Sequence, residues 1–302
     1  MRRWHVVSLK QLALVTALAI AGFAVAAAPE AAAPRGAQAQ ALYARYLQLA
    51  PLLEHNQFGR ALHLDSAQSD TSLTGAVAAV VDHPFAQVQT ALRSAPNWCR
   101  LLLLHVNIQS CRVALAATGA ELKVGMGQKT SGAADLVYPL DFEFRLAADS
   151  ADYLEARLSA AQGPLSTRDY RLSLKATALG ADKTYLQMTY TYGFGFAGRM
   201  AMQVYLATVG RNKVGFTLQG PGADGRDGYI GGMRGVVERN AMRYYLAIDA
   251  HLASYAAPPE KQFEAALQGW FDAAERYPRQ LHDLDRGSYL AKKRSEFARS
   301  QN

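Results

Sequence analysis

Apolar and polar residues alternate with a period of two along most of the middle of the chain. Near residue 142, for example, Phe142 and Phe144 alternate with Asp141 and Glu143. The pattern recurs at residues 113–115, 122–126, 142–146, 154–158, 172–176, 186–192 and 214–218. Consecutive strands with one apolar and one polar face are typical of an antiparallel sheet that is wetted on one side. The apolar segment 73–81 predicts one more strand ahead of them, and 61–64 a short one.

A second period, of three to four residues, predicts the helices. Its widest apolar stripe runs from Val236 to Tyr255, and this long helix would cover the apolar face of the sheet. Two short helices are expected to begin near Pro84 and Pro96, because proline at the first helical position loses no hydrogen bond. Other helices are predicted at 41–55, 199–209 and 263–274, with a basic, solvated helix from Ser288 onward.

The first 28 residues have the features of a secretory signal. Arg2, Arg3 and Lys10 form a basic start, an apolar core follows at 12–25, and Ala24-Val25-Ala26 offers a small-x-small cleavage site. The alternative is an uncleaved membrane anchor, although the apolar stretch is shorter than the ~20 residues of a spanning helix. We therefore expect a signal peptide at 1–28 and a linker at 29–40, and a periplasmic or secreted protein.

The remainder, residues 41–302, is expected to form a single domain with its core at 73–255 and a helical extension at 258–302. Half of the residues are hydrophobic, which is enough for a sizeable core. The net charge is +7, and part of it lies in the leader. The mildly basic remainder suits an anionic membrane surface or an acidic ligand. Nucleic-acid binding is not expected, because no basic patch is interleaved with aromatic residues.

The two cysteines, Cys99 and Cys111, are 12 positions apart. In an oxidising compartment they would pair as a disulfide, and the alternative is two buried free thiols. The spacing excludes a CxxC redox pair, and no histidine pair accompanies the cysteines to build a zinc site. We expect neither a metal nor a cofactor.

The order of the predicted elements is a strand, two helices, a long antiparallel sheet and a long helix. This order resembles the START-like (SRPBCC) superfamily of helix-grip proteins, which includes lipid-transfer domains, polyketide cyclases and the major birch-pollen allergen group. The residues that carry the resemblance are Val77–Val88 (VAAVVDHPFAQV), Trp98 and Met242–Leu252, and it spans about 73–255. The insert after Tyr192 and the added helices at both ends depart from the family pattern.

The resemblance implies an α+β helix-grip fold, in which a curved antiparallel sheet wraps around a long C-terminal helix. It also implies a hydrophobic cavity between the sheet and that helix, and no shared catalytic residues. The residues expected to line the cavity are Trp98, Phe142, Phe144, Leu172, Leu174, Met188, Tyr190, Phe216, Arg234, Tyr244, Tyr245 and Ile248.

Charged residues cluster at the start of the long helix: Arg234, Glu238, Arg239 and Arg243. One interpretation is that an arginine reaches the cavity mouth and holds a ligand carboxylate or phosphate, which its planar fork suits. The other is that these residues form surface ion pairs such as Arg234 with Glu238.

The insert contains Gly193, Gly195 and Gly198, which spell GxGxxG. A dinucleotide site would need a βαβ unit and an acidic residue ~20 positions later, but residues 184–223 contain no Asp or Glu. The glycines more simply permit a sharp bend and close packing. The apolar helix that follows would form a ligand portal with Met202 and Val204, touching a membrane surface, or would be buried in the core.

Catalytic motifs are scarce, since the chain has no GxSxG, no HExxH and no P-loop. The leading hypothesis is an exported binding or carrier protein for a lipid or another hydrophobic small molecule. The second is a cyclase- or hydrolase-like enzyme on the same scaffold. The third is a structural envelope protein whose inner face is filled by its own aromatic side chains.

Overall fold

Eight antiparallel strands form the central sheet in the computed structural model, which describes all residues except 2–34, 117–118, 128–136, 209, 222–226 and 302. The sheet order is β1-β2-β8-β7-β6-β5-β4-β3. The strands are β1 (Leu62–Gln68), β2 (Ser72–Val81), β3 (Ile108–Ala116), β4 (Gly119–Met126), β5 (Tyr138–Asp149), β6 (Tyr153–Gln162), β7 (Thr167–Ala178) and β8 (Thr184–Phe194). The alternating segments predicted this sheet, with the exception of 214–218. The predicted signal segment 1–28 lies outside the described residues, apart from Met1.

Two short helices, α2 (Phe85–Leu92) and α3 (Ala95–Leu102), carry the chain from β2 near one edge to β3 at the other. From β3 to β8 each strand pairs with the next, and β8 returns beside β2, where Val77 lies opposite Met188. A disulfide between Cys99 and Cys111 joins α3 to β3 and confirms the predicted pairing.

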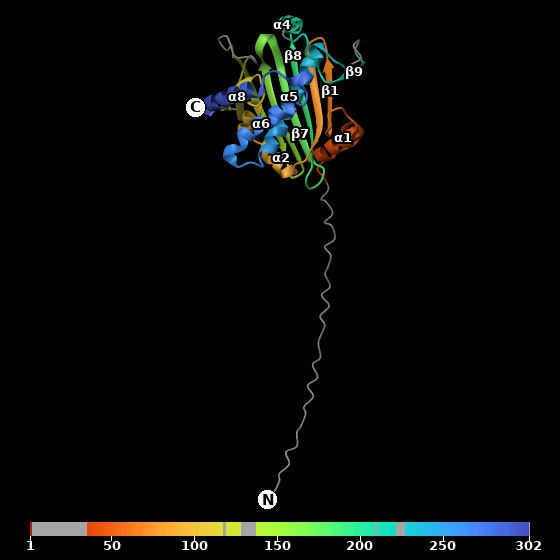
Figure 1. Cartoon of the computed structure of the whole chain (residues 1–302), viewed down its shortest axis with the longest axis vertical. Helices are drawn as coiled ribbons and strands as arrows, with labels where there is room; N and C mark the ends of the chain where they lie inside the picture. The colour runs from red at the N-terminus through yellow and green to blue at the C-terminus, as the bar shows by residue number, and fades with distance from the viewer. Residues whose placement is uncertain (2–34, 117–118, 128–136, 209, 222–226, 302) are drawn as a thin grey trace. The chain divides into compact units, whose positions relative to one another are not determined.

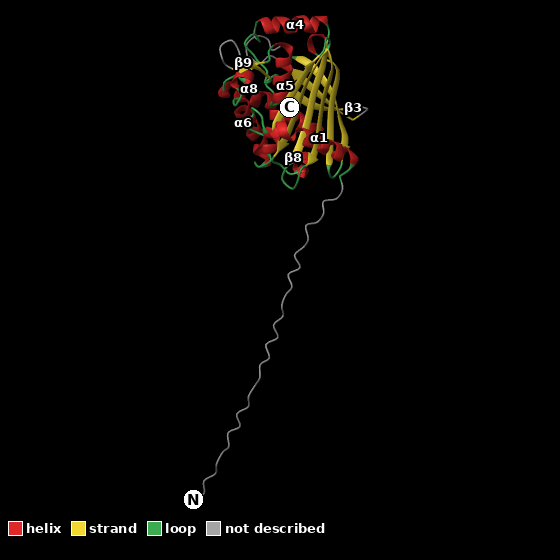
Figure 2. Ribbon diagram, turned by 90° about the vertical axis from the view of Figure 1, so that its right-hand side faces the viewer, coloured by secondary structure: helices red, strands yellow, loops and turns green. Residues whose placement is uncertain are grey.

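The long helix α5 (Gly232–Ser254) lies across one face of the sheet, with α6 (Gln262–Ala274) and α8 (Arg286–Gln301) on the same side (Figures 1 and 2). It approaches β2 closely at Gly75, where an added Cβ would lie 2.9 Å from the Ala241 Cβ. Such an approach requires glycine, because any side chain would push the helix outward. The α+β helix-grip fold predicted from the sequence is therefore present.

Opposite ends of the sheet carry different helices. Val81 at the end of β2 pairs with Thr184, so α2 follows at that end. Ser72 at the other end of β2 pairs with Gly193, so α4 (Phe196–Ala207) follows β8 at the opposite end (Figure 1). The two ends of α5 therefore meet different surroundings.

The outer face of the sheet is covered in part by α1 (Ala37–Glu54). Leu42 and Leu49 of this helix pack with Ala78 and Tyr185 from the outer face in a second hydrophobic cluster. The prediction of a uniformly wetted outer face is therefore wrong here, because the N-terminal helix shields it. The helix also begins at Ala37, inside the segment predicted as a linker.

The C-terminal helix α8 was predicted to be solvated, but one of its faces packs against the domain. The hydroxyl of Tyr289 donates to the Leu104 carbonyl at 2.8 Å, and Lys293 Nζ donates to the Ile108 carbonyl at 2.6 Å. Lys293 is also paired with Glu296 at 2.7 Å, and both are buried. The charge content suggested a solvated helix, but this buried ion pair allows the charged face to pack. None of the described helices has the length and apolar character needed to cross a bilayer.

The predicted strand at 214–218 is not part of the sheet. The carboxylate of Glu238 accepts hydrogen bonds from the backbone amides of Phe216 at 2.6 Å and Thr217 at 2.9 Å. These amides are therefore satisfied by a side chain instead of a neighbouring strand. A separate two-stranded ribbon follows, made of β9 (Leu218–Pro221) and β10 (Asp227–Tyr229). The short helix α7 (Pro278–Leu281) connects α6 to α8.

Candidate functional site

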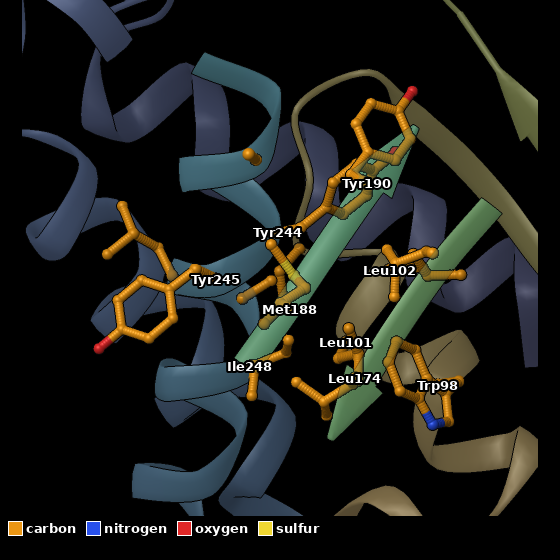
Figure 3. Close-up of a cluster of buried hydrophobic side chains, with 14 of the residues drawn as sticks. Trp98, Leu101, Leu102, Leu174, Met188, Tyr190, Tyr244, Tyr245 and Ile248 are labelled. Atoms are coloured by element: carbon orange, nitrogen blue, oxygen red, sulfur yellow. The ribbon is translucent and has the colours of Figure 1, made fainter. Parts of the chain in front are cut away.

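The middle of the space between sheet and α5 is filled by side chains. Figure 3 shows Trp98, Leu174, Met188 and Ile248 close together between α3, the sheet and α5. Trp98 is fully buried, and its Nε1 donates to the Leu92 carbonyl at 2.8 Å. Most residues predicted to line a cavity belong instead to this packed core, namely Trp98, Phe142, Phe144, Leu172, Leu174, Met188, Tyr244 and Ile248.

A cavity of about 300 Å³ remains beside the N-terminal half of α5, below α4. Its walls come from segments far apart in the sequence, and they combine apolar and polar side chains. The residues that line it are Asn107, Met126, Pro164, Leu165, Thr167, Tyr170, Tyr190, Tyr192, Gly198, Ala201, Met202, Tyr205, Val236, Arg239, Asn240 and Arg243. Of the residues predicted from the sequence, Tyr190 and Met202, the latter predicted for a portal, lie here.

Arg239 and Arg243, one helical turn apart on α5, are the charged residues of this lining. Arg239 is 2 % exposed, and its Nη1 donates to the Val214 carbonyl at 3.1 Å. Burial lowers the pKa of Arg239, and the nearby Tyr205 hydroxyl partly opposes that effect. Among the described residues, no carboxylate lies within ion-pair distance of Arg239.

Arg243 differs from Arg239 because it has a counter-charge. Its Nη2 lies 2.6 Å from the Asp283 carboxylate, which also pairs with Lys213 at 3.3 Å. The Nε of Arg243 is buried and has no hydrogen-bond partner among the described residues, and the same holds for Oδ1 of Asn107. Two unsatisfied polar atoms therefore belong to residues that line the cavity.

Three tyrosines of β7 and β8, Tyr170, Tyr190 and Tyr192, form the cavity wall on the sheet side. Tyr170 and Tyr192 stack with ring centroids 5.3 Å apart, and Tyr190 lies 5.1 Å from Tyr244 of α5. Burial raises the pKa of Tyr170, Tyr190 and Tyr192 above the ordinary value. These hydroxyls therefore remain protonated at neutral pH and can orient a ligand by hydrogen bonding, but they do not serve as bases.

Three residues expected in the lining lie elsewhere. Arg234 faces β1, where its Nε and Nη2 donate to the hydroxyl and the carbonyl of Ser66 at 3.0 and 2.9 Å. Tyr245 is buried but lies on the side of α5 turned away from the sheet (Figure 3), with the Arg60 guanidinium 5.1 Å from its ring centre. Phe216 packs against Phe58. Arg234 and Tyr245 both belong to α5. They miss the cavity because an α-helix turns by 100° per residue, which places neighbours such as Tyr244 and Tyr245 on different faces.

Sequence reasoning placed Arg239 and Arg243 in a charged cluster but selected Arg234 for the cavity. A usable signal was the spacing of Val236, Arg239, Asn240 and Arg243, which share one helical face. Asn107, Tyr170 and Tyr192 carried no comparable signal, because only the folded sheet brings them to the same end of α5.

The glycines of the GxGxxG sequence serve close packing. An added Cβ at Gly198 would lie 3.2 Å from both the Leu165 carbonyl oxygen and the Phe194 Cβ. The turn into α4 therefore sits tightly against the β6–β7 connection. Among the described residues, no three His, Cys, Asp or Glu side chains gather as a metal site.

The helix α4 is a surface helix that also forms part of the cavity wall. Phe196 is 81 % exposed and Val204 is 60 % exposed, whereas Met202 is half-buried and lines the cavity. The alternative that this helix is buried in the core is therefore wrong.

No family model matches the chain, and no curated protein matches it. Solved structures to which it is similar include norcoclaurine synthase from Thalictrum flavum, with 15% identity, a TM-score of 0.33 and coverage of 45% of this chain and 86% of that one. A second is Ara h 8.0201, with 13% identity, a TM-score of 0.35 and coverage of 64% of this chain and 99% of that one. A third is the Zhui aromatase/cyclase from Streptomyces sp. R1128, with 14% identity, a TM-score of 0.30 and coverage of 71% of this chain and 95% of that one. These are START-like helix-grip proteins, and the likeness is one of fold.

Proposed function

We propose that this protein is an exported binding or carrier protein for a lipid or another hydrophobic small molecule. The observation that carries the proposal is the cavity of about 300 Å³ between α4, α5 and the ends of β7 and β8. Such mixed lining is typical of small-molecule sites, in which apolar walls supply affinity and a few polar groups orient the ligand. The Cys99–Cys111 disulfide supports an oxidising compartment, such as the periplasm or the exterior.

Native mass spectrometry of the protein purified from its own host tests this proposal. We expect a co-purifying hydrophobic molecule in the wild type. Ala201→Trp would fill the cavity from α4 and abolish that adduct, whereas Ala197→Trp, an exposed position on the same helix, would retain it. A wild-type protein that remains empty, and that takes up no apolar probe, would favour the structural protein with a filled core.

The exposed face of α4 supports contact with an anionic membrane surface during ligand exchange. Phe196, Met200 and Val204 repeat every four residues and are exposed, and Arg199 and Arg211 lie close to them in sequence and at the surface. An amphipathic helix of this kind can lie in the headgroup region with its apolar side chains buried. The helix would then act as the portal, with Met202 on its inner side.

Vesicles of phosphatidylglycerol and phosphatidylcholine provide the measurement. Val204→Asp should weaken co-sedimentation with them about tenfold or more, because it replaces an exposed apolar side chain that would enter the headgroup region with a negative charge. Leu52→Asp, at a similarly exposed apolar position on α1, is the matched control and should bind as the wild type does. If Met202→Asp and Val204→Asp leave both vesicle binding and ligand uptake unchanged in a folded protein, α4 is not the portal.

A further inference from the structure

The lining of the cavity has an unbalanced charge. It contains two arginines, and no Asp or Glu is among the residues that form it. Asp283 pairs with Arg243 and Lys213, and it acts on Arg239 only as the last of several weaker charge effects, without forming an ion pair with it. One buried positive charge, that of Arg239, therefore faces the cavity with no carboxylate at ion-pair distance in the described part of the chain.

A buried charge in this position lowers the stability of the ligand-free protein. Removing a guanidinium from water costs several kcal/mol unless a counter-charge and hydrogen bonds replace the lost hydration. The Val214 carbonyl accepts one of the five hydrogen bonds that a guanidinium can donate, and the Tyr205 hydroxyl offers a second partner. The remaining donors of Arg239 are left for a ligand or for water inside the cavity.

Other polar atoms at the same place have unmet hydrogen-bonding capacity. The Nε of Arg243 is a buried donor without a partner, and the Asn107 side chain carries a buried Oδ1 in the same condition. Arg243 lies close enough to Arg239 for the two positive charges to repel, which lowers the pKa of Arg239 further. An anion between them would relieve this repulsion and also satisfy the free Nε donor.

We propose that the ligand of this cavity carries an acidic head group, a carboxylate or a phosphate, which pairs with Arg239 and accepts a hydrogen bond from Arg243 Nε. This inference rests on the proposed function, because it specifies the class of molecule that the cavity binds. The planar guanidinium matches both acids through two parallel hydrogen bonds. A volume near 300 Å³ is at the lower end of the range of about 300–1,000 Å³ for ligand sites, so a small amphiphile fits.

Three probes with the same ten-carbon chain separate the head group from the tail: decanoate, decyl phosphate and decanol. Isothermal titration calorimetry at pH 7.5 should show at least about tenfold tighter binding of one acid than of decanol. The preferred acid identifies the head group as carboxylate or phosphate. Arg239→Met should abolish that preference, while the affinity for decanol stays within about threefold of wild type.

Arg234→Met is the matched control, because Arg234 is on the same helix but binds Ser66 outside the cavity. It should retain the preference for the acid. Arg239→Lys keeps the charge and should retain part of the preference. It replaces Arg239→Met in the experiment if circular dichroism shows that the methionine variant is unfolded.

The outcomes distinguish the two proposals. Equal binding of the acids and decanol would overturn the acidic head group and leave the hydrophobic-ligand function standing. A preference that survives in Arg239→Met would overturn the role of Arg239. Failure of the wild type to bind any of the three probes would overturn both proposals.

Discussion

The two ends of the long helix α5 face the same sheet, but one end is tightly packed and the other borders a cavity. Toward its C-terminus, Ile248 and Leu252 are buried in a solid core with Trp98 and its neighbours. Toward its N-terminus, Arg239 and Arg243 border a cavity beneath α4. The close contact between Gly75 and Ala241 lies between the two ends. One helix therefore anchors the fold at one end and leaves room for a ligand at the other.

The difference shows where this fold gains stability and where it gives some up. The packed end buries apolar area, which contributes ~25 cal/mol per Å². The hollow end keeps the Arg239 guanidinium away from water, and Arg243 Nε and Asn107 Oδ1 have no hydrogen-bond partner there among the described residues. In the same part of the chain, the packed end holds no buried arginine of this kind, although Nε2 of His251 also has no partner. Sites that violate the rules of packing in this way are commonly functional, because selection maintains them against their cost in stability.

The largest effect should follow from emptying the packed end. Trp98→Ala removes a fully buried indole and its hydrogen bond to Leu92, and should lower the free energy of unfolding by about 3–5 kcal/mol. Met202→Ala at the cavity wall should cost less than about 1 kcal/mol, because Met202 already borders empty space. Urea denaturation followed by circular dichroism measures both, and equal losses would contradict the contrast between the ends.

Acid should weaken the packed end through His251. Burial lowers the pKa of His251 from 6.5 to about 4. The unfolded chain therefore binds the proton more readily, so stability is retained above pH 6.5 and falls by ~3 kcal/mol as the pH drops to 4. His251→Asn, which can still donate to the Ala91 backbone, should flatten this part of the stability curve.

Denaturation midpoints of the wild type and His251→Asn, taken at intervals between pH 4 and 7, provide that measurement. The exposed His55→Asn variant is the control and should follow the wild type. A parallel decline in the wild type and His251→Asn would assign the acid sensitivity to other groups.

The smallest of these effects has the opposite sign and occurs at the hollow end. Arg239→Met should raise the stability of the ligand-free protein by about 1–3 kcal/mol, because it removes a buried charge that forms no ion pair among the described residues. Arg234→Met should lower it by about 1 kcal/mol, because the hydrogen bonds to Ser66 are lost. Thermal unfolding of both variants sharpens the comparison, and a destabilised Arg239→Met would show that the ligand-free site satisfies this charge.

The sequence by itself determined the architecture. Period-two alternation marked six of the eight strands of the sheet, an apolar segment marked β2, a short segment marked β1, and a wide apolar stripe marked α5. These signals are local, because a strand or helix buries its face through residues close together in the chain. The disulfide could be predicted because the chain has two cysteines and the expected compartment is oxidising. The strand predicted at 214–218 is not in the sheet. Its alternation could not reveal that the Glu238 carboxylate accepts the hydrogen bonds of its backbone amides.

Only the tertiary structure decided where the inner face is packed and where it is hollow. A cavity depends on distances between elements, and here Asn107, Tyr192, Met202 and Arg239 meet from four separate parts of the chain. The same cause explains the other misjudged positions. Tyr185 lies on the outer face of the sheet, where the alternation places it, but α1 buries it; Lys293 of the helix predicted to be solvated is buried with Glu296. Periodicity specifies which face of an element is apolar, but the partner that covers it, or the space left open, depends on the packing of the whole domain.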